Sequence, residues 1–300
     1  MITPIEKYPA LAKAIGIKDL IFKREDMHPY GSHKGRSIPI MIDHYIKTGS
    51  KNFVISSSGN AALAAALHIH KINSDISNNT GLATIDSTKI TLDIFVGNHI
   101  QHYKLEKLKA IEDENIRVLI KERPLQAATL RGQEGATSLR QSTDDEALVG
   151  YDALARELAQ IEGIGAMFIG TSSGTTAQAL ATFFLKNNVP IQLHIVQTSS
   201  CHPIADGLET YDGENVDSIA DAIVDRTAMR KEKLVPMIKK TGGNAWIANN
   251  DEIESAIDMV KKNIGLDIST NSALSIVGLM QSVYRGWEID GTAVCIICGD

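Results

Sequence analysis

Residues 21–37 of the chain read IFKREDMHPYGSHKGRS, and they place one lysine, Lys34, in an unusual setting. A Pro-Tyr-Gly break at residues 29–31 is followed by Ser32, a suitable cap for a helix over residues 38–49. Lys34 is therefore predicted near a helix start, where backbone N–H groups and the helix dipole disfavour an ammonium. A neutral amine or an imine suits that position better, as in lysines that attack carbonyl groups. A solvated surface lysine is the alternative for this segment taken alone.

Two further segments place small polar turns in front of predicted helices. Residues 55–70, ISSSGNAALAAALHIH, read as a strand end, a Ser-Ser-Ser-Gly-Asn turn and an alanine-rich helix. Residues 167–184, MFIGTSSGTTAQALATFF, read as a buried strand, a Gly/Ser/Thr turn and another helix. Helix starts that carry small residues and hydroxyl groups are suited to bind anions. A nucleophilic lysine together with two such turns predicts an anionic aldehyde cofactor.

In this order and at these separations, the three segments resemble the fold-type II pyridoxal-phosphate enzymes. This family includes threonine synthase, serine and threonine dehydratases, cysteine synthase and the tryptophan synthase β-chain. Its lysine motif, K-x-E-x-x-x-P-x-G-S-x-K, matches residues 23–34, its asparagine motif matches residues 57–60, and its phosphate loop matches residues 170–176. Threonine synthase and its relatives look most similar. The resemblance implies pyridoxal 5'-phosphate (PLP) as the cofactor.

The resemblance also implies roles for the residues that match the first two motifs. Lys34 would form the Schiff base with the cofactor and then move protons at the α- and β-carbons of the substrate. Asn60 would bond the phenolic oxygen of the cofactor, and a helix cap is its structural alternative. Ser57, Ser58 and Gly59 would bind the substrate carboxylate, and an ordinary ST turn is the alternative for each serine.

By the same resemblance, five residues of the third motif would bind the cofactor phosphate: Thr171, Ser172, Ser173, Gly174 and Thr175. The family often has Gly-Gly at the Ser-Ser pair, whose hydroxyl groups could add donors. His33 would contact the phosphate or pack beside the cofactor ring. Cys298 would face the pyridine nitrogen, where a neutral group favours elimination and replacement over transamination. Packing alone is the alternative for Cys298, and Asp300 is another candidate partner for that nitrogen.

Strand and helix patterns alternate along the chain. Apolar β-rich runs predict strands at residues 52–55, 91–96, 116–120, 166–169, 191–196 and 292–297. Helical periodicity is clearest at residues 61–70, 103–112, 151–161, 176–186, 252–263 and 272–284. This alternation predicts an α/β protein with βαβ crossovers and mostly parallel sheets.

The resemblance implies a two-lobed fold-type II enzyme with twisted, mostly parallel sheets and helices on both faces. Residues 1–45 and 150–300 would form the larger, cofactor-binding lobe, and residues 46–149 would form a smaller mobile lobe. Residues 73–88 have no periodicity and are interpreted as an inserted surface loop.

Composition agrees with a cytoplasmic enzyme. The chain has 300 residues, of which 43% are hydrophobic, enough for a sizeable core. The net charge of −6 gives no reason to expect nucleic acid or an anionic membrane surface. Neither a membrane span nor a secretory signal is predicted. Cys295 and Cys298 are expected on opposite faces of a strand, so a metal site is not predicted.

Three departures from the family pattern bear on activity. Gly35 and Pro39 alter the helix behind Lys34, and Pro39 is expected to bend it. Ala147 stands where threonine synthases tend to carry an arginine that can serve a substrate phosphate. We expect a PLP-dependent lyase or transferase that acts by elimination or replacement at Cβ or Cγ of a small amino acid. We also expect it to be a homodimer. Serine/threonine dehydratase and a PLP-binding regulatory protein with little turnover are the alternatives.

Overall fold

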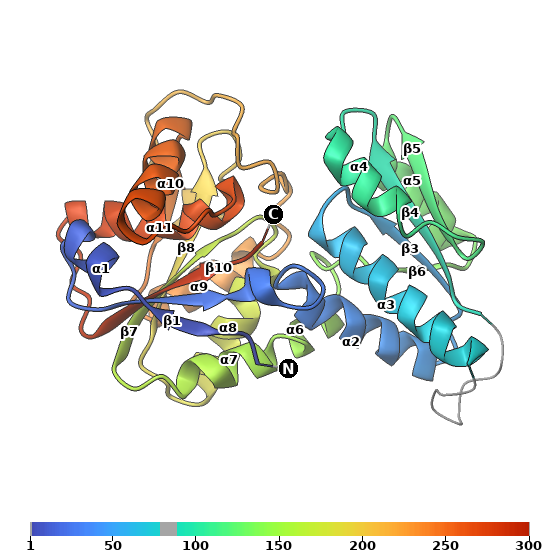
Figure 1. The fold of residues 1–300 in the computed structure, drawn as a ribbon, viewed down its shortest axis with the longest axis horizontal. Coiled ribbons are helices and arrows are strands. Elements are labelled where there is room, and N and C mark those ends of the chain that lie inside the picture. The colour runs from blue at the N-terminus through green and yellow to red at the C-terminus, as the bar shows by residue number, and fades with distance from the viewer. Residues whose placement is uncertain (1, 79–88, 300) are drawn as a thin grey trace. The chain divides into compact units, whose positions relative to one another are not determined.

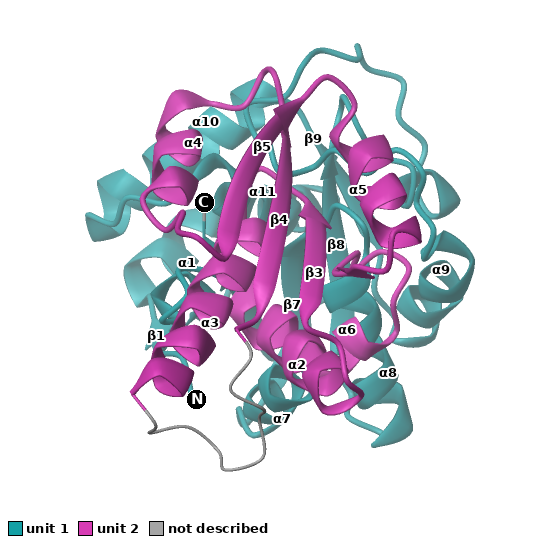
Figure 2. Ribbon diagram, turned by 90° about the vertical axis from the view of Figure 1, so that its right-hand side faces the viewer, with its two compact units in different colours: residues 1–33, 151–300 teal, residues 34–150 magenta. Residues whose placement is uncertain are grey.

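The chain divides into two compact units, which are coloured separately in Figure 2. The structure is a computed structural model that describes residues 2–78 and 89–299. Unit 1 comprises Met1–His33 and Tyr151–Asp300, and unit 2 comprises Lys34–Gly150. Each unit has its own sheet and its own helices.

Unit 1 is built on a six-stranded sheet with the strand order β1-β2-β10-β7-β8-β9. The strands are β1 (Ile5–Lys7), β2 (Leu20–Arg24), β7 (Ile164–Gly170), β8 (Gln192–Thr198), β9 (Ala245–Ala248) and β10 (Thr292–Ile297). β1 is antiparallel to β2, and every other neighbouring pair is parallel. The inner strands are apolar on both faces, as expected where helices cover both sides of a parallel sheet.

Helices cover both faces of the unit 1 sheet (Figure 1). They are α1 (Pro9–Ile15), α7 (Asp152–Ala159), α8 (Thr175–Lys186), α9 (Lys231–Lys240), α10 (Asn250–Ile264) and α11 (Thr270–Tyr284). One layer contains α7, α8 and α9, which pack successively on one another, and the other contains α1, α10 and α11. Right-handed crossovers produce this division, because the chain moves outward from β7 to β9 and then returns to β10.

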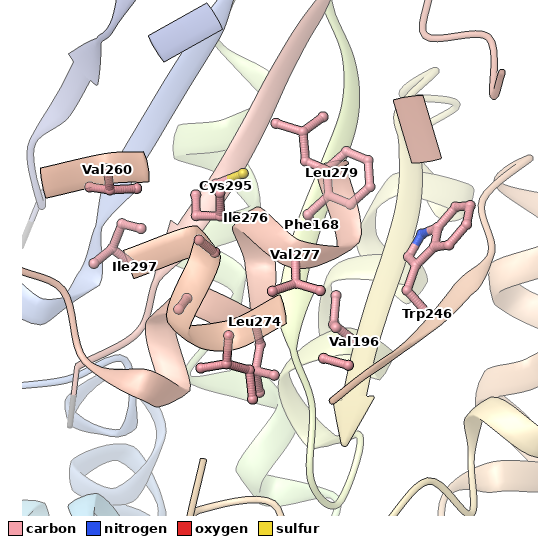
Figure 3. Packing of buried hydrophobic residues seen from close by; sticks show 14 of the residues in the cluster. Phe168, Val196, Trp246, Val260, Leu274, Ile276, Val277, Leu279, Cys295 and Ile297 are labelled. Carbon is pink, nitrogen blue, oxygen red and sulfur yellow. The ribbon is translucent and has the colours of Figure 1, made fainter. Parts of the chain in front are cut away.

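The core of unit 1 lies between α11 and the sheet (Figure 3). Phe168, Val196 and Trp246 of neighbouring strands are buried against this helix. Gly278 makes the close approach possible, because an added Cβ would lie 2.4 Å from Val196 Cγ2. Cys295 belongs to the same core, and burial raises the pKa of its thiol above the usual range.

Unit 2 contains a four-stranded, fully parallel sheet with the order β5-β4-β3-β6. Its strands are β3 (Asn52–Ser56), β4 (Thr91–Gly97), β5 (Ile116–Lys121) and β6 (Thr137–Ser138). Its helices are α2 (Lys34–Lys47), α3 (Asn60–Ser77), α4 (His102–Lys109), α5 (Pro124–Gln133) and α6 (Glu146–Val149). Helices α3 and α4 lie on one face of the sheet and α5 on the other, as Figure 2 shows. The mixed α/β class with mostly parallel sheets is thus confirmed for both sheets.

Two expectations about unit 2 differ from the structure. The larger lobe was predicted to include residues 34–45, but these lie in α2, which packs on α3 and α6 and so belongs to unit 2. Helix α2 runs from Lys34 to Lys47 with Pro39 inside it. The predicted inserted loop began at residue 73, but α3 extends to Ser77 because Asn73 bonds both the carbonyl and the N–H of Ile90. The remainder of that loop, residues 79–88, lies outside the described residues.

Candidate cofactor site

The predicted phosphate turn connects β7 to α8 within unit 1. Gly174 takes the cap position of α8 with φ +84° and ψ 1°, a left-handed conformation that glycine adopts without strain. Thr171 N–H donates to Val196 O at 2.8 Å, which fixes the start of the turn. Ser173 Oγ and Thr175 Oγ1 lie 2.9 Å apart at its end.

The backbone of this turn has features that suit an anion. A Cβ added at Gly174 would lie 2.8 Å from Leu234 Cδ2 and 3.0 Å from Ile204 Cδ1, so the backbone packs tightly on that side. The turn opens a helix of 12 residues, whose dipole and first N–H groups favour negative charge. Hydroxyl groups and a tight glycine turn at a helix start therefore suit the phosphate of PLP.

Ser172 is used differently from what its sequence suggested. Its hydroxyl oxygen accepts the backbone N–H groups of Val224 at 3.1 Å and Asp225 at 3.2 Å. The side chain thus attaches the segment around residue 224 to the phosphate turn. This contact gives a structural reason for a serine where the family often has glycine.

His33 and Cys298 lie together at the end of β10. The backbone N–H of His33 donates to Cys298 O at 3.2 Å, and His33 Nδ1 lies 3.1 Å from the same oxygen. Cys298 Sγ lies 3.8 Å from Ser272 Oγ. Ser272 belongs to the first turn of α11, which Ser269 caps by accepting the Ser272 N–H at 3.2 Å. Cys298 Sγ also lies 3.7 Å from the carbonyl oxygen of Gly299. Asp300 lies outside the described residues.

Both groups of unit 1 residues lie at one edge of its sheet. β7 and β10 are parallel neighbours, and each ends next to its candidate residues. Ligands in open α/β sheets bind at the carboxyl ends of the strands. This position agrees with a cofactor site formed by the phosphate turn and the residues after β10.

Unit 2 carries the other predicted residues at two helix starts. Lys34 is the first residue of α2, so the helix begins slightly later than a cap at Ser32 would give. Asn60 is the first residue of α3, and Gly59 takes the cap position, so Asn60 is not the helix cap. Helices α2 and α3 pack on each other and run in the same direction, because β3 returns between them. Lys34 and Asn60 therefore lie at the same end of unit 2.

The serines before α3 form a local turn. Ser57 Oγ accepts the Gly59 N–H at 3.3 Å, which is the pattern of an ST turn. Ser57 thus has a structural role, while Ser58 stands beside it in the turn that follows β3. The structure places Ser57, Ser58 and Gly59 in unit 2 with Lys34, and the phosphate turn in unit 1 with His33 and Cys298.

A buried network surrounds Ala147, one of the departures from the family pattern. Ser37 Oγ donates to Ala147 O at 2.6 Å and accepts from Gln141 Nε2 at 2.8 Å. Ala147 is completely buried, and a Cβ at Gly150 would lie only 2.2 Å from Arg36 O. The segment around Ala147 is therefore a tight support for α2. An arginine at this position could not be accommodated without repacking.

Several residues of unit 1 were not found from the sequence. Gln197 and Ser272 contact the candidate residues Ser172 and Cys298 across long separations in the chain. Ser269 contacts Gly299, the neighbour of Cys298. Tyr151 is completely buried, its ring lies 6.2 Å from that of His33, and its hydroxyl has no hydrogen-bond partner among the described residues. None of these residues stands in a motif, so only the folded chain identifies them.

Metal sites and membrane spans are two further features considered for the described residues of the chain. Within residues 2–78 and 89–299, no group of three His, Cys, Asp or Glu side chains is arranged to hold a metal ion. In the same part of the chain, none of the helices combines the length and the apolar character needed to cross a membrane.

Comparison with known proteins extends over the whole chain. A family model described as pyridoxal-phosphate dependent enzyme matches residues 2–299. The threonine synthase of Methanosarcina acetivorans is 24% identical over 313 residues, covering 99% of this chain and 74% of the relative. The threonine synthase of Mycobacterium tuberculosis is 22% identical over 308 residues, covering 99% of this chain and 81% of the relative.

Solved structures show the same fold. A PLP-dependent aspartate racemase has a TM-score of 0.81 at 18% identity, covering 100% of this chain and 90% of that chain. Threonine deaminase isoform 2 from Solanum lycopersicum has a TM-score of 0.77 at 20% identity, covering 99% of this chain and 83% of that chain. The predicted fold-type II architecture and the PLP cofactor are confirmed. The chain belongs to the family of pyridoxal-phosphate dependent enzymes.

Proposed function

We propose that this enzyme is a lyase or transferase that carries out elimination or replacement at Cβ or Cγ of a small amino acid. The threonine synthases among its relatives support this choice. The observation that carries it is the position of Cys298 after β10, where a cysteine stands in place of a carboxylate and its Sγ lies 3.8 Å from Ser272 Oγ. A neutral partner leaves a pyridine nitrogen largely unprotonated, which favours elimination and replacement over transamination.

In this proposal each predicted residue has a defined task. Lys34, the first residue of α2, holds the cofactor and moves a proton at the substrate α-carbon. Bound PLP supplies an electron sink for that carbon. Asn60 orients the cofactor ring, and the turn at residues 57–59 binds the substrate carboxylate. The turn at residues 171–175 binds the phosphate.

The region around Ala147 favours a substrate whose leaving group is not strictly a phosphate. Ala147 is completely buried, and its carbonyl is bonded by Ser37. The cation that could serve a substrate phosphate in threonine synthases is therefore missing at this position. Losing one charge-assisted contact weakens binding by about 1.5–3 kcal/mol, roughly ten- to a hundredfold. Serine/threonine dehydration is accordingly the second candidate function.

Steady-state assays with serine, threonine and O-phosphohomoserine would test this proposal. We expect release of ammonia or a replacement product from serine or threonine, at higher kcat/KM than for O-phosphohomoserine. Efficient threonine formation from O-phosphohomoserine, with little deamination of the other two, would show that the argument from Ala147 is wrong. Bound cofactor without turnover of any of the three would favour the regulatory alternative.

We further propose a homodimer that acts in the cytoplasm, as predicted from the sequence. Light scattering on the purified holoenzyme would give its mass, for comparison with 32.5 kDa for one chain. Fractionation of the source cells would test the location. A monomer at micromolar concentration, or recovery outside the cytoplasmic fraction, would contradict these two points.

A further inference from the structure

A buried glutamine that no motif contains connects the phosphate turn to the rest of unit 1. Gln197 lies on β8 and its side chain is completely buried. Its Oε1 accepts the backbone N–H groups of Ile204 and Ala205, each at 2.9 Å. Its Nε2 donates to Ser172 O at 3.3 Å. One amide thus bonds three backbone groups, and the third belongs to the turn.

The contact to Ser172 determines the direction of the next N–H group. A trans peptide unit is planar, so its N–H points away from its C=O. Because Gln197 holds the carbonyl of Ser172 on one side, the N–H of Ser173 is directed to the opposite side. The Ser172 hydroxyl is fixed as well, since it accepts the N–H groups of Val224 and Asp225. The peptide unit between Ser172 and Ser173 is therefore held through the Ser172 carbonyl and through the Ser172 side chain.

We propose that Gln197 is a positioning residue for phosphate binding, which directs the Ser173 N–H toward the anion. This inference rests on the proposed role of residues 171–175 in binding the cofactor phosphate. Preorganised N–H donors bind an anion better than donors that must first reorient, because no reorganisation is needed on binding. Gln197 does not touch the cofactor in this proposal and acts only through the turn.

The test compares PLP with pyridoxal, which has the same ring and aldehyde but no phosphate. Gln197→Met removes the amide without adding a charge, and Gln197→Asn keeps an amide that is one methylene shorter. Gln192→Met is the matched control, because Gln192 lies on the same strand at its other end and bonds Glu288 and Trp287. Dissociation constants are measured by absorbance titration of the full chain after removal of the cofactor.

We expect both Gln197 variants to weaken PLP binding about tenfold, the worth of one well-placed hydrogen bond. Pyridoxal binding should change less than twofold, and the Gln192 variant should match wild type for both ligands. A general loss of structure would weaken the binding of PLP and of pyridoxal equally, and that result would overturn the proposal. Unchanged PLP binding in a folded Gln197 variant would overturn it as well. If Gln197→Met does not fold, Gln197→Asn decides the test by the same comparison, the loss of PLP affinity relative to the loss of pyridoxal affinity. If wild type bound PLP and pyridoxal equally, the phosphate role of the turn itself would be wrong.

Discussion

Lys34 is the first residue of α2 and the proposed attachment point of the cofactor. We expect Lys34→Ala to abolish covalent attachment of PLP and all turnover while the protein remains folded, since the side chain is not part of a core. Borohydride reduction followed by peptide mass mapping would measure attachment. Lys47→Ala is the control, because Lys47 is exposed at the other end of the same helix, where the dipole favours a cation. Cofactor found on another lysine in the Lys34 variant would refute the assignment.

His194 makes stability depend on pH. Its ring is buried and stacks on Phe168 at 4.5 Å, and Nδ1 accepts from Asn244 N–H and Trp246 Nε1–H. Burial lowers the pKa of His194 from 6.5 to about 3. In the unfolded chain His194 therefore binds a proton below pH 6.5, whereas in the native state it binds one only near pH 3. The contribution of His194 to stability is fully present above its pKa in the unfolded chain. It is lost as the pH falls toward its pKa in the folded protein.

We expect this group to lower the free energy of unfolding by about 1.4 kcal/mol for each pH unit between about pH 6 and pH 4. Urea unfolding at several pH values would measure the slope. His194→Phe should be less stable at neutral pH, because two donors lose their acceptor, but its slope should be shallower than that of wild type. His99→Gln, at an exposed position, should leave the slope unchanged. Equal slopes in wild type and His194→Phe would contradict the linkage.

Among the elements, the start of α8 is most sensitive to substitution. Gly174→Asp combines a left-handed φ, contacts with Leu234 and Ile204, and a carboxylate beside the phosphate position. Backbone strain of this kind costs about 1–3 kcal/mol. We therefore expect at least a tenfold loss of PLP affinity. The cofactor that remains bound after dialysis measures this loss. Gly174→Ala, with the strain but without the charge, should lose less. Gly265→Asp has a similar φ but open space around it, and it should retain PLP like wild type.

Elements with strong periodicity could be predicted from the sequence, and weakly patterned ones could not. Each predicted strand and helix has its counterpart, with ends displaced by a few residues. Helix α9 was missed because Pro236 inside it reads as a break, and β9 because four residues show no alternation. The phosphate turn and the helix starts were found because motifs are local. Gln197 and Ser272 were not, because their contacts depend on which strands become neighbours.

At the scale of the whole molecule, the two units offer separate probes of unfolding. Both tryptophans of the chain, Trp246 and Trp287, lie in unit 1, so tryptophan fluorescence reports on that unit alone. Leu92 is completely buried on β4 of unit 2. We expect Leu92→Ala to destabilise unit 2 by about 2–5 kcal/mol. Far-UV circular dichroism should then show an earlier urea transition that fluorescence does not follow.

Leu279→Ala, in the core of unit 1, is the matched variant and should shift the fluorescence transition. Coincident transitions by both probes in the Leu92 variant would mean that the two units unfold as one cooperative block.

The central position of β10 has a consequence for synthesis on the ribosome. β2 is made early, yet its parallel neighbour β10 is the last strand of the described chain and lies between β2 and β7. Unit 2 occupies one continuous stretch of sequence, so all its strands are available well before β10 emerges. The nascent chain therefore carries β2 with one apolar edge unpaired through most of translation, a state in which strands are prone to aggregate. The order of emergence lets unit 2 fold first and leaves unit 1 to close around the last strand.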